Sequence, residues 1–139
     1  RLHPLAAATT GAMSVGLCLA VATSIVAALP VERFTLSWTH SIEKVAWEED
    51  WRIDPDRRSL VLVESRVRGS GAGMEPPQGA VLRNGTWHAP GGLEVPRLRL
   101  ALSGFTDDWQ LCTSAGCRPL RQRTGVDSGT VELFACPVR

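Results

Sequence analysis

Residues 34–53 read FTLSWTHSIEKVAWEEDWRI, and two alternating patterns in this stretch decide the fold. The first pattern sets apolar residues and a histidine against small hydroxyl residues: Phe34, Leu36, Trp38 and His40 against Thr35, Ser37 and Thr39. Period-two alternation of this kind is typical of a half-buried β-strand. His40 therefore extends a face that is otherwise apolar.

The second pattern places a carboxylate among aromatic residues. Every second residue from 45 to 53 shares one face: Val45, Trp47, Glu49, Trp51 and Ile53. An unpaired, ionised carboxylate is costly there, so Glu49 must find a hydrogen-bond donor, become protonated or lie at a cleft. A short loop at residues 41–44 puts Val45 opposite His40. This register brings Glu49 nearer Leu36 than His40.

The rest of the chain contains further short strands separated by turn residues. Residues 60–68 are rich in β-branched side chains, and residues 98–102 alternate leucine with arginine or alanine. Asn84-Gly85 is the strongest hairpin signal, because both residues accept the positive φ of a two-residue turn. No part of the chain after residue 30 has a helical apolar period. The pattern predicts an all-β domain, a small antiparallel sandwich or partly open barrel of about seven short strands.

An uncharged segment, residues 5–29, precedes this domain. It is long enough to span a bilayer with some tilt. Its second half also has the length of a signal-peptide hydrophobic region, with Val26 and Ala28 as small residues before a cleavage after Ala28. We expect one uncleaved N-terminal transmembrane helix rather than a removed signal.

This helix would divide the chain into two parts with a defined topology. Residues 1–30 form the membrane anchor or signal segment, and residues 31–139 form an extracytoplasmic β-domain. Arg1 before the apolar run favours a cytoplasmic N-terminus. We therefore expect a single-pass protein of the cytoplasmic membrane with its C-terminal domain in the periplasm or outside the cell.

The charge of the chain argues against nucleic acid as a partner. The formal net charge is +1, and Arg1 is the one arginine, lysine or acidic residue before Glu32, so the predicted domain is neutral. It has no basic stripe with interleaved aromatic residues. We expect Arg118, Arg121 and Arg123 to be solvated residues of a loop or of a strand exterior.

Three cysteines, Cys112, Cys117 and Cys136, lie in the predicted domain, and Cys18 lies in the predicted membrane segment. In an oxidising compartment, three thiols indicate one disulfide and one cysteine left over. Chain entropy does not choose between a Cys112–Cys117 and a Cys117–Cys136 bond. Proximity favours Cys112–Cys117, because a four-residue hairpin loop would set the two residues opposite each other.

The alternative use of these cysteines is a metal site completed by His88 or His40. Structural zinc sites usually contain paired Cys-x-x-Cys ligands, and this chain has no such pair. We therefore expect neither a metal nor another cofactor.

The tripeptide Thr39-His40-Ser41 suggests a base beside a nucleophile. Neighbouring strand residues point to opposite faces, so His40 cannot serve Ser41 unless the strand ends there. Glu49 could orient His40, but the register separates them, and buried polar networks are commoner than active sites. Gly71-Ala72-Gly73 lacks the lysine of a phosphate loop, which leaves a tight crossover or a close backbone approach to a ligand.

Four short motifs together resemble a bacterial family of unknown function, DUF1850. They are F-x-L-x-x-x-H-S-I-E-K at 34–44, E-E at 48–49, L-V-E-S-R at 62–66 and S-G-A-G-M at 70–74. Proteins like this are typically encoded beside TRAP transporters of the TAXI type, which implies an accessory role in solute uptake. The residues that match motif positions are His40, Ser41, Glu49, Glu64, Gly71, Ala72 and Gly73.

Two classes of function follow. The first is a non-enzymatic, membrane-tethered module that binds a transporter subunit or its solute-binding protein. The second is a small periplasmic enzyme, hydrolase-like or metal-dependent, that uses His40 with Glu49 or Glu64. The lack of a complete triad or metal set in the sequence favours the first. In both, we expect His40, Ser41, Glu49 and the loop at residues 71–73 to form one polar site at an end of the domain.

Overall fold

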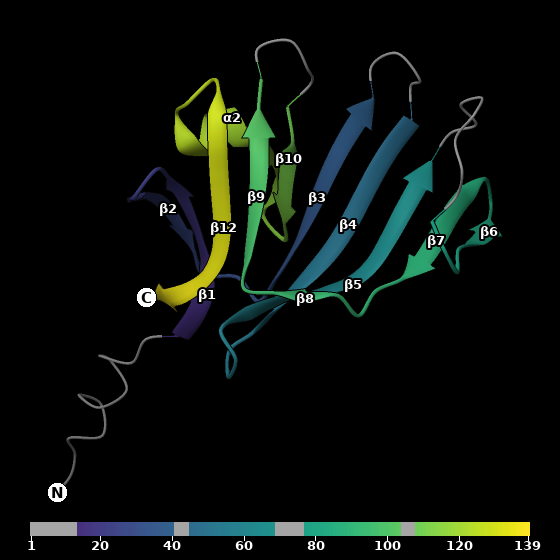
Figure 1. The fold of residues 1–139 in the computed structure, drawn as a ribbon, viewed down its shortest axis with the longest axis horizontal. Coiled ribbons are helices and arrows are strands. Elements are labelled where there is room, and N and C mark those ends of the chain that lie inside the picture. Colours follow the sequence, from purple (N-terminus) through teal and green to yellow (C-terminus); the bar gives the residue numbers. More distant parts are fainter. Residues whose placement is uncertain (1–13, 41–44, 69–76, 104–107) are drawn as a thin grey trace, which may run out of the picture.

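The predicted pair of strands is the centre of the larger of two antiparallel sheets (Figure 1). The structure is a computed structural model that describes residues 14–40, 45–68, 77–103 and 108–139. β3 (Arg33–His40) pairs with β4 (Val45–Asp54) in the predicted register, with His40 opposite Val45 and Leu36 opposite Glu49.

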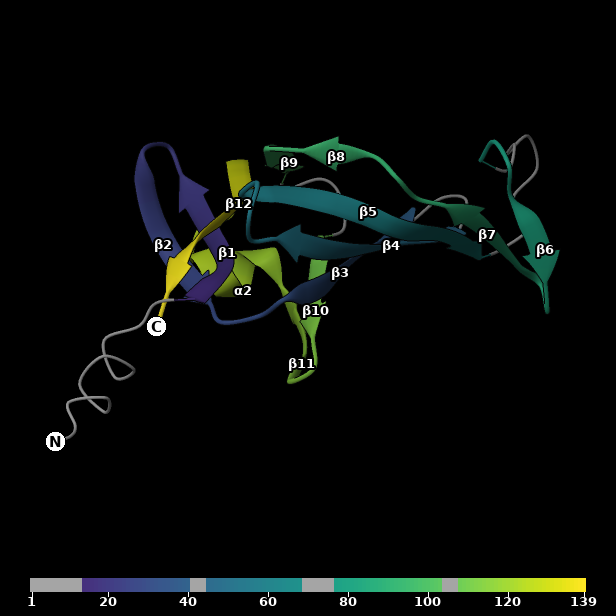
Figure 2. The ribbon, with the colours of Figure 1, turned by 90° about the horizontal axis from the view of Figure 1, so that it is seen from below.

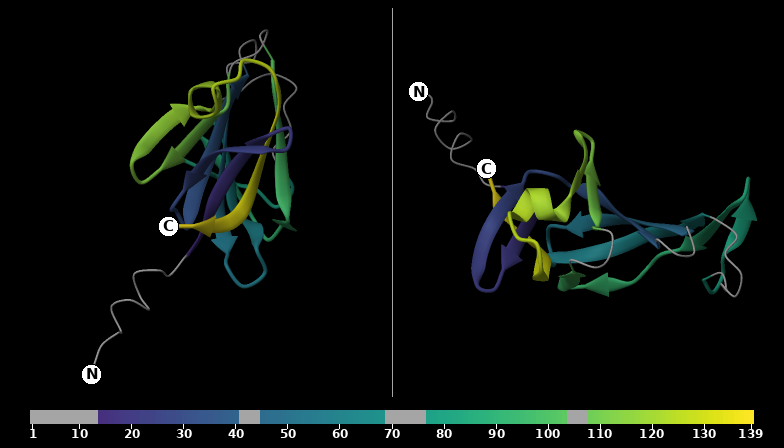
Figure 3. Two further views of the ribbon diagram at one scale, coloured as in Figure 1. Left: turned by 90° about the vertical axis from the view of Figure 1, so that its left-hand side faces the viewer. Right: turned by 90° about the horizontal axis from the view of Figure 1, so that it is seen from above.

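The larger sheet grows from this pair on both sides, in the order β11-β10-β3-β4-β5-β7-β6. Its other strands are β5 (Ser59–Arg68), β6 (Val81–Arg83), β7 (Thr86–Pro90), β10 (Gln110–Thr113) and β11 (Gly116–Pro119), with the short β8 (Glu94–Val95) paired to β5. The predicted turn joins β6 to β7, with φ of 51° at Asn84 and 79° at Gly85. The β10–β11 hairpin projects from the rest of the fold (Figure 3).

A β-bulge in β5 changes which residues face the core. Across β4 and β5, Asp50 is opposite Glu64 but Trp51 is opposite Leu62, so Val63 has no partner on β4. Leu60 before the bulge and Val67 after it are both fully buried, although their positions differ in parity. Gly91 covers the bulge, because a Cβ at this position would overlap the backbone of Leu62 and Val63.

The smaller sheet has the order β2-β1-β12-β9. Its strands are β1 (Ser14–Val21), β2 (Ser24–Leu29), β9 (Arg97–Leu102) and β12 (Gly129–Val138). β1 pairs with β12 along its whole length, from Ser14 opposite Val138 to Val21 opposite Val131. The first strand thus pairs with the last strand of the chain, and β2 pairs with β1 on its other side. Both N-terminal strands lie at the opposite end of the molecule from β6 (Figure 2).

The predicted transmembrane helix is wrong for residues 14–29, which form a β-hairpin. Short apolar runs fit a helix or a buried strand equally well by hydrophobicity, and β-branched residues such as Val15, Val21 and Ile25 favour the strand. The hairpin turns at Ala22, whose φ is 56°. Within the described residues, no helix combines the length and the apolar character that crossing a membrane requires.

The core lies between the two sheets, and leucines from both dominate it. The fully buried leucines are Leu17, Leu19, Leu36, Leu60, Leu111, Leu120 and Leu133. The all-β, antiparallel prediction is confirmed, but the described residues form twelve strands rather than about seven. Strands of two to four residues such as β6, β8 and β11 are too short to show a period in the sequence.

One short helix, α2 (Leu120–Thr124), was not predicted. Asp108 caps its first turn, since its Oδ2 accepts a hydrogen bond from the Arg121 amide at 2.8 Å. Gly125 ends the helix in the left-handed conformation, with φ of 77°. The helix places Leu120 in the core, fully buried.

Two disulfides tie the fold. Cys112 and Cys117 face each other across the β10–β11 hairpin and are bonded, as the spacing predicted. Cys18 is bonded to Cys136, which joins β1 to β12 across a sequence separation of 118. This second bond was not predicted, because Cys18 lies in the segment that was expected to cross the membrane.

The two disulfides should differ in their contribution to stability. In the chain-entropy model, a bond that closes a loop of over a hundred residues contributes about 4–5 kcal/mol, whereas the short β10–β11 loop contributes about 2 kcal/mol. Urea unfolding of the Cys18→Ala/Cys136→Ala and Cys112→Ala/Cys117→Ala double variants measures the difference. Equal losses, or a larger loss for the hairpin pair, would show that loop length does not govern the stabilisation.

Candidate functional site

The two faces of β4 carry two different arrangements of polar residues. Glu49 points into the space between the sheets, whereas Glu48 and Asp50 point to the outer face of the larger sheet. The inner arrangement is an apolar cleft and the outer one is a network of charges.

The inner arrangement is a cleft of about 500 Å³, here called the tryptophan cleft. It lies between the larger sheet and the edge strand β9, and its lining residues are Leu36, Trp38, Trp47, Glu49, Arg99, Leu100, Ala101 and Trp109. The three tryptophans are half-buried, and the rings of Trp38 and Trp109 stack with centroids 6.2 Å apart and an interplanar angle of 28°. A hollow of about 590 Å³ near Pro30 and Arg52 contains no aromatic residue.

Glu49 is the acidic residue of the tryptophan cleft. Its Oε1 accepts a hydrogen bond of 3.2 Å from the indole Nε1 of Trp51, a residue that is only 2% exposed. Glu49 forms no ion pair with any residue in the described part of the chain. The sequence left three outcomes open for this carboxylate: a hydrogen-bond donor, protonation or a position at a cleft. The structure shows the donor, which is Trp51, and the position at a cleft.

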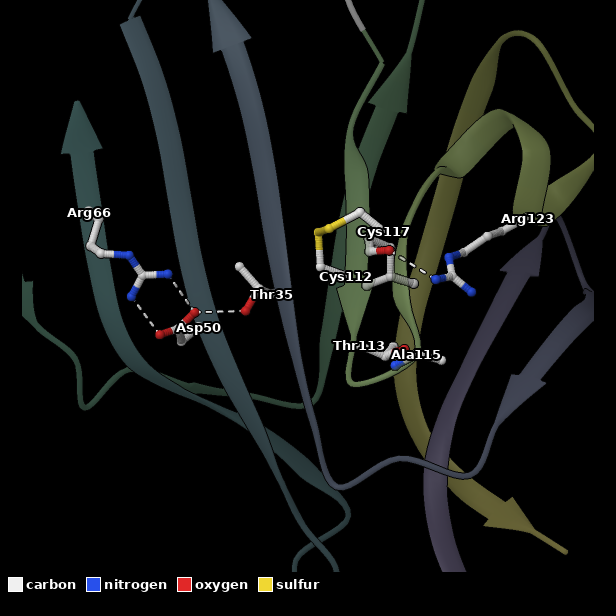
Figure 4. Close-up of a disulfide and its surroundings, with 9 residues drawn as sticks. Thr35, Asp50, Arg66, Cys112, Thr113, Ala115, Cys117 and Arg123 are labelled. Atoms are coloured by element: carbon white, nitrogen blue, oxygen red, sulfur yellow. Dashed lines mark hydrogen bonds and ion pairs between the residues drawn. A yellow bond between two sulfur atoms is a disulfide. The ribbon is translucent and has the colours of Figure 1, made fainter. Parts of the chain in front are cut away.

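The outer arrangement is a network centred on Arg66 of β5. Its guanidinium contacts both oxygens of Asp50 at 2.6 and 2.8 Å, Glu64 at 2.9 Å and Glu48 at 3.3 Å. Thr35 of β3 donates a hydrogen bond of 2.7 Å to the same Asp50 (Figure 4). Three adjacent strands are thus linked across their outer face.

Charge pairing shifts the ionisation of this network. The hydrogen bonds from Arg66 hold the pKa of Asp50 below its ordinary value, and Thr35 lowers it further, against the opposing effect of burial. Arg66 and then His88, whose Nδ1 lies 3.2 Å from Oε1 of Glu64, lower the pKa of Glu64. The hydrogen bond to Asp50 raises the pKa of Arg66. The carboxylates of the network are therefore occupied with its own cations.

The predicted site residues fall in different places. Glu49 and Glu64 lie on opposite faces of the larger sheet, so the structure does not bring them together. His40 ends β3, but its side chain lies outside the described residues, as do Ser41 and Gly71-Ala72-Gly73. A shared site of Glu49 with His40, Ser41 and the glycine loop stays a prediction.

The sequence left a position at a cleft open for Glu49, but it did not identify the other residues that line the cleft. Alternation along the strands places Trp38 on the same face as Leu36 and Trp47 on the same face as Glu49, so these two residues could have been found. Trp109 and β9 join the cleft through long-range packing, for which the sequence contains no local signal.

Arg121 and Arg123 were predicted to be solvated, and this was wrong. Arg123 donates a hydrogen bond of 2.9 Å to the carbonyl of Leu111, and Arg121 donates to the carbonyls of Ser103 and Asp127. Burial lowers the pKa of Arg123, with a further contribution from Arg118. Both guanidinium groups donate to main-chain oxygens, and Nε of Arg123 is buried without a partner among the described residues. A count of charges along the chain cannot reveal such contacts.

The cysteine-based metal site loses its ligands, because all four cysteines are in disulfides. Among the residues that the structure describes, no three His, Cys, Asp or Glu side chains gather closely enough to hold a metal ion.

The Arg66 network should make stability sensitive to acid. Asp50 and Glu64 have a folded pKa below the ordinary values of 3.8 and 4.5, so their stabilisation is fully present above these values and is lost as the pH falls through the folded pKa. Arg66→Met should lower stability at neutral pH by about 1–2 kcal/mol and weaken this acid dependence. Urea unfolding from neutral to acidic pH measures both effects.

The matched control is Arg68→Met. The side chain of Arg68 is 63% exposed, and its one ion pair within the described residues is a contact of 3.4 Å with Glu48. This variant should therefore lose much less stability and keep the acid dependence of the wild type. Equal behaviour of the two variants would mean that the network around Arg66 does not stabilise the sheet.

Comparison with known proteins identifies a family that matches this chain. The family model of the Domain of unknown function (DUF1850) matches residues 34–120, which include both faces of β4 and exclude β1, β2 and β12. No curated protein and no solved structure matches the chain. Because the match covers more than half of the 139 residues, the chain belongs to the DUF1850 family.

Proposed function

We propose that this protein is an exported binding module that holds a small ligand in the tryptophan cleft. The observation that carries the proposal is the cleft itself, about 500 Å³ in volume, with three half-buried tryptophans around one carboxylate. Ligand sites typically have this size, an apolar and aromatic lining, and a few polar groups that orient the ligand.

The two disulfides support the extracytoplasmic part of the proposal. Disulfides persist in oxidising compartments and are rare in the cytosol of most organisms. All four cysteines are paired, and Cys18 and Cys136 are nearly buried, at 2% and 5% exposure. Such pairing suits the periplasm or the cell exterior.

The family resemblance supports an accessory role. Members of the DUF1850 family resemble this chain in the motifs around Glu49 and Glu64, and the resemblance implies an association with TAXI-type TRAP transporters. A transporter subunit or its solute-binding protein is accordingly the expected partner. A module that binds a small ligand beside such a transporter would present or sense the transported solute.

Binding is favoured over catalysis by the composition of the cleft. Acid–base and nucleophilic mechanisms need at least two groups that act together on the substrate. Among the described lining residues, Glu49 is the one carboxylate, and Arg99 is occupied by Glu132 at 2.9 Å. Glu64, the alternative partner in the enzyme hypothesis, lies on the other face of the sheet.

The cleft should bind a neutral apolar dye at one site per molecule. Nile red is expected to bind with energy transfer from tryptophan, and Trp47→Ala should abolish this binding because it removes one aromatic wall. Trp87→Ala is the matched control, since Trp87 belongs to β7 and does not line the cleft. Binding that survives Trp47→Ala but is lost in Trp87→Ala would place the dye elsewhere and refute the cleft as a ligand site.

The partner is tested with the same pair of variants. A purified solute-binding protein of a TAXI-type TRAP transporter should be retained by the wild type and by Trp87→Ala. If neither the wild type nor Trp87→Ala retains the solute-binding protein, the accessory role is refuted. The result of the dye-binding experiment would not be affected.

Export should be visible in the state of the cysteines. Cells lysed in the presence of a thiol-alkylating reagent should yield a protein with no alkylated cysteine, because each thiol is oxidised in an extracytoplasmic compartment. Reduction before alkylation should label all four cysteines. Full labelling without reduction would contradict export.

A further inference from the structure

We propose that the ligand of the tryptophan cleft is a small organic cation with an alkylated ammonium group, and that Glu49 is its counter-ion. This inference rests on the proposed function, because it names the chemical class that the cleft binds.

The first step is the unbalanced charge of Glu49. Trp51 holds Oε1 with a hydrogen bond of 3.2 Å, whereas Oε2 has no hydrogen bond to any residue in the described ranges. The side chain is half-buried in an apolar lining. A carboxylate in such a place without a cation is unfavourable, and a bound cation would remove this penalty.

The carboxylates on the outer face of the same strand are paired with a cation. Glu48 and Asp50, the neighbours of Glu49 in β4, both form ion pairs with Arg66. Of the three successive carboxylates, the outer two face Arg66, whereas Glu49 faces the aromatic cleft. Among the described residues, Glu49 therefore lacks the ion pair that the other two carboxylates have.

The second step is the aromatic lining. The ring faces of tryptophan attract cations more strongly than those of the other aromatic residues. Trp38, Trp47 and Trp109 surround the cleft, and the first and last of these stack on each other. Aromatic residues around a carboxylate are the arrangement that recognises substituted ammonium groups.

The lining also excludes other cations. A metal ion would need several oxygen ligands, and the cleft offers one carboxylate among its described residues. A bare ammonium group would need several acceptors for its N–H donors. Alkyl groups on the nitrogen instead contact apolar side chains such as Leu36 and Leu100 and leave no donor unsatisfied.

The third step concerns Arg99, whose charge would oppose a cation. Along β9, Leu98 and Leu100 pack against the core side, so Arg99 alternates to the outer face of the smaller sheet. There its Nε contacts Glu132 of β12 at 2.9 Å, and the side chain is 73% exposed. Arg99 borders the cleft, but its guanidinium is already paired with Glu132 and forms no ion pair with Glu49 in the described part of the chain.

The experiment compares choline with its neutral isostere, the alcohol in which a tert-butyl group replaces the trimethylammonium group. The two compounds have nearly the same shape and differ in charge. Isothermal titration of the full chain should give a Kd for choline at least about tenfold lower than for the isostere. Added salt should weaken choline binding and leave isostere binding unchanged.

Two variants assign the preference to named groups. Glu49→Gln keeps an oxygen that can accept the Trp51 hydrogen bond, and it should remove the preference for choline while isostere binding remains. Glu48→Gln makes the same change in net charge on the outer face and should keep the preference. Trp109→Leu preserves an apolar wall but removes a ring face, so it should reduce the preference without loss of the isostere.

The outcomes separate this inference from the proposed function. Equal affinities for choline and the isostere, or binding of neither, overturn the cation inference, whereas Nile red binding decides independently whether the cleft takes ligands at all. Loss of the preference in Glu48→Gln as well as in Glu49→Gln would overturn the role of Glu49, since net charge alone would then explain the effect. Near-ultraviolet circular dichroism confirms that each variant is folded.

Discussion

The register between β3 and β4 is the constraint on which the rest of the structure depends. It places Leu36 opposite Glu49 and Thr35 opposite Asp50, which puts the cleft on one face and the Arg66 network on the other. A shift of one residue in this pairing would exchange the two faces of a strand. With the observed register, Glu48 and Asp50 face Arg66 on the outer side of the sheet, and Glu49 faces the tryptophans on the inner side.

This register was predictable because its determinants are local. Period-two alternation and the length of one loop are properties of residues 34–53 alone, and the structure has the pairing that they predict. The Asn84-Gly85 turn and the Cys112–Cys117 bond were predictable for the same reason, since each connects residues close in sequence. Local chemistry therefore specified the centre of the larger sheet and two of its hairpins.

The features that sequence reasoning missed depend on contacts between distant residues. An apolar run such as residues 14–29 looks the same whether lipid or β12 covers it, and its partner lies at the other end of the chain. The Cys18–Cys136 bond and the position of Trp109 in the cleft share this difficulty. Arg121 and Arg123 were predicted to be solvated because their partners are main-chain carbonyls, which every residue has and which a pattern of charged side chains does not include.

The bulge at Val63 explains how one strand serves both the core and the network. Without the bulge, strict alternation would put Leu60, Leu62, Glu64 and Arg66 on one face of β5. Either the two leucines would then lie on the outer face, or Glu64 and Arg66 would lie in the core. The extra residue resets the alternation, and Leu62 turns inward beside Trp51 while Arg66 turns outward to Asp50. Trp51 in turn stacks on Phe34 in the core, with centroids 6.5 Å apart, and holds Glu49 by its indole. The position of the cleft carboxylate therefore follows from the packing of the core, which orients it before any ligand is bound.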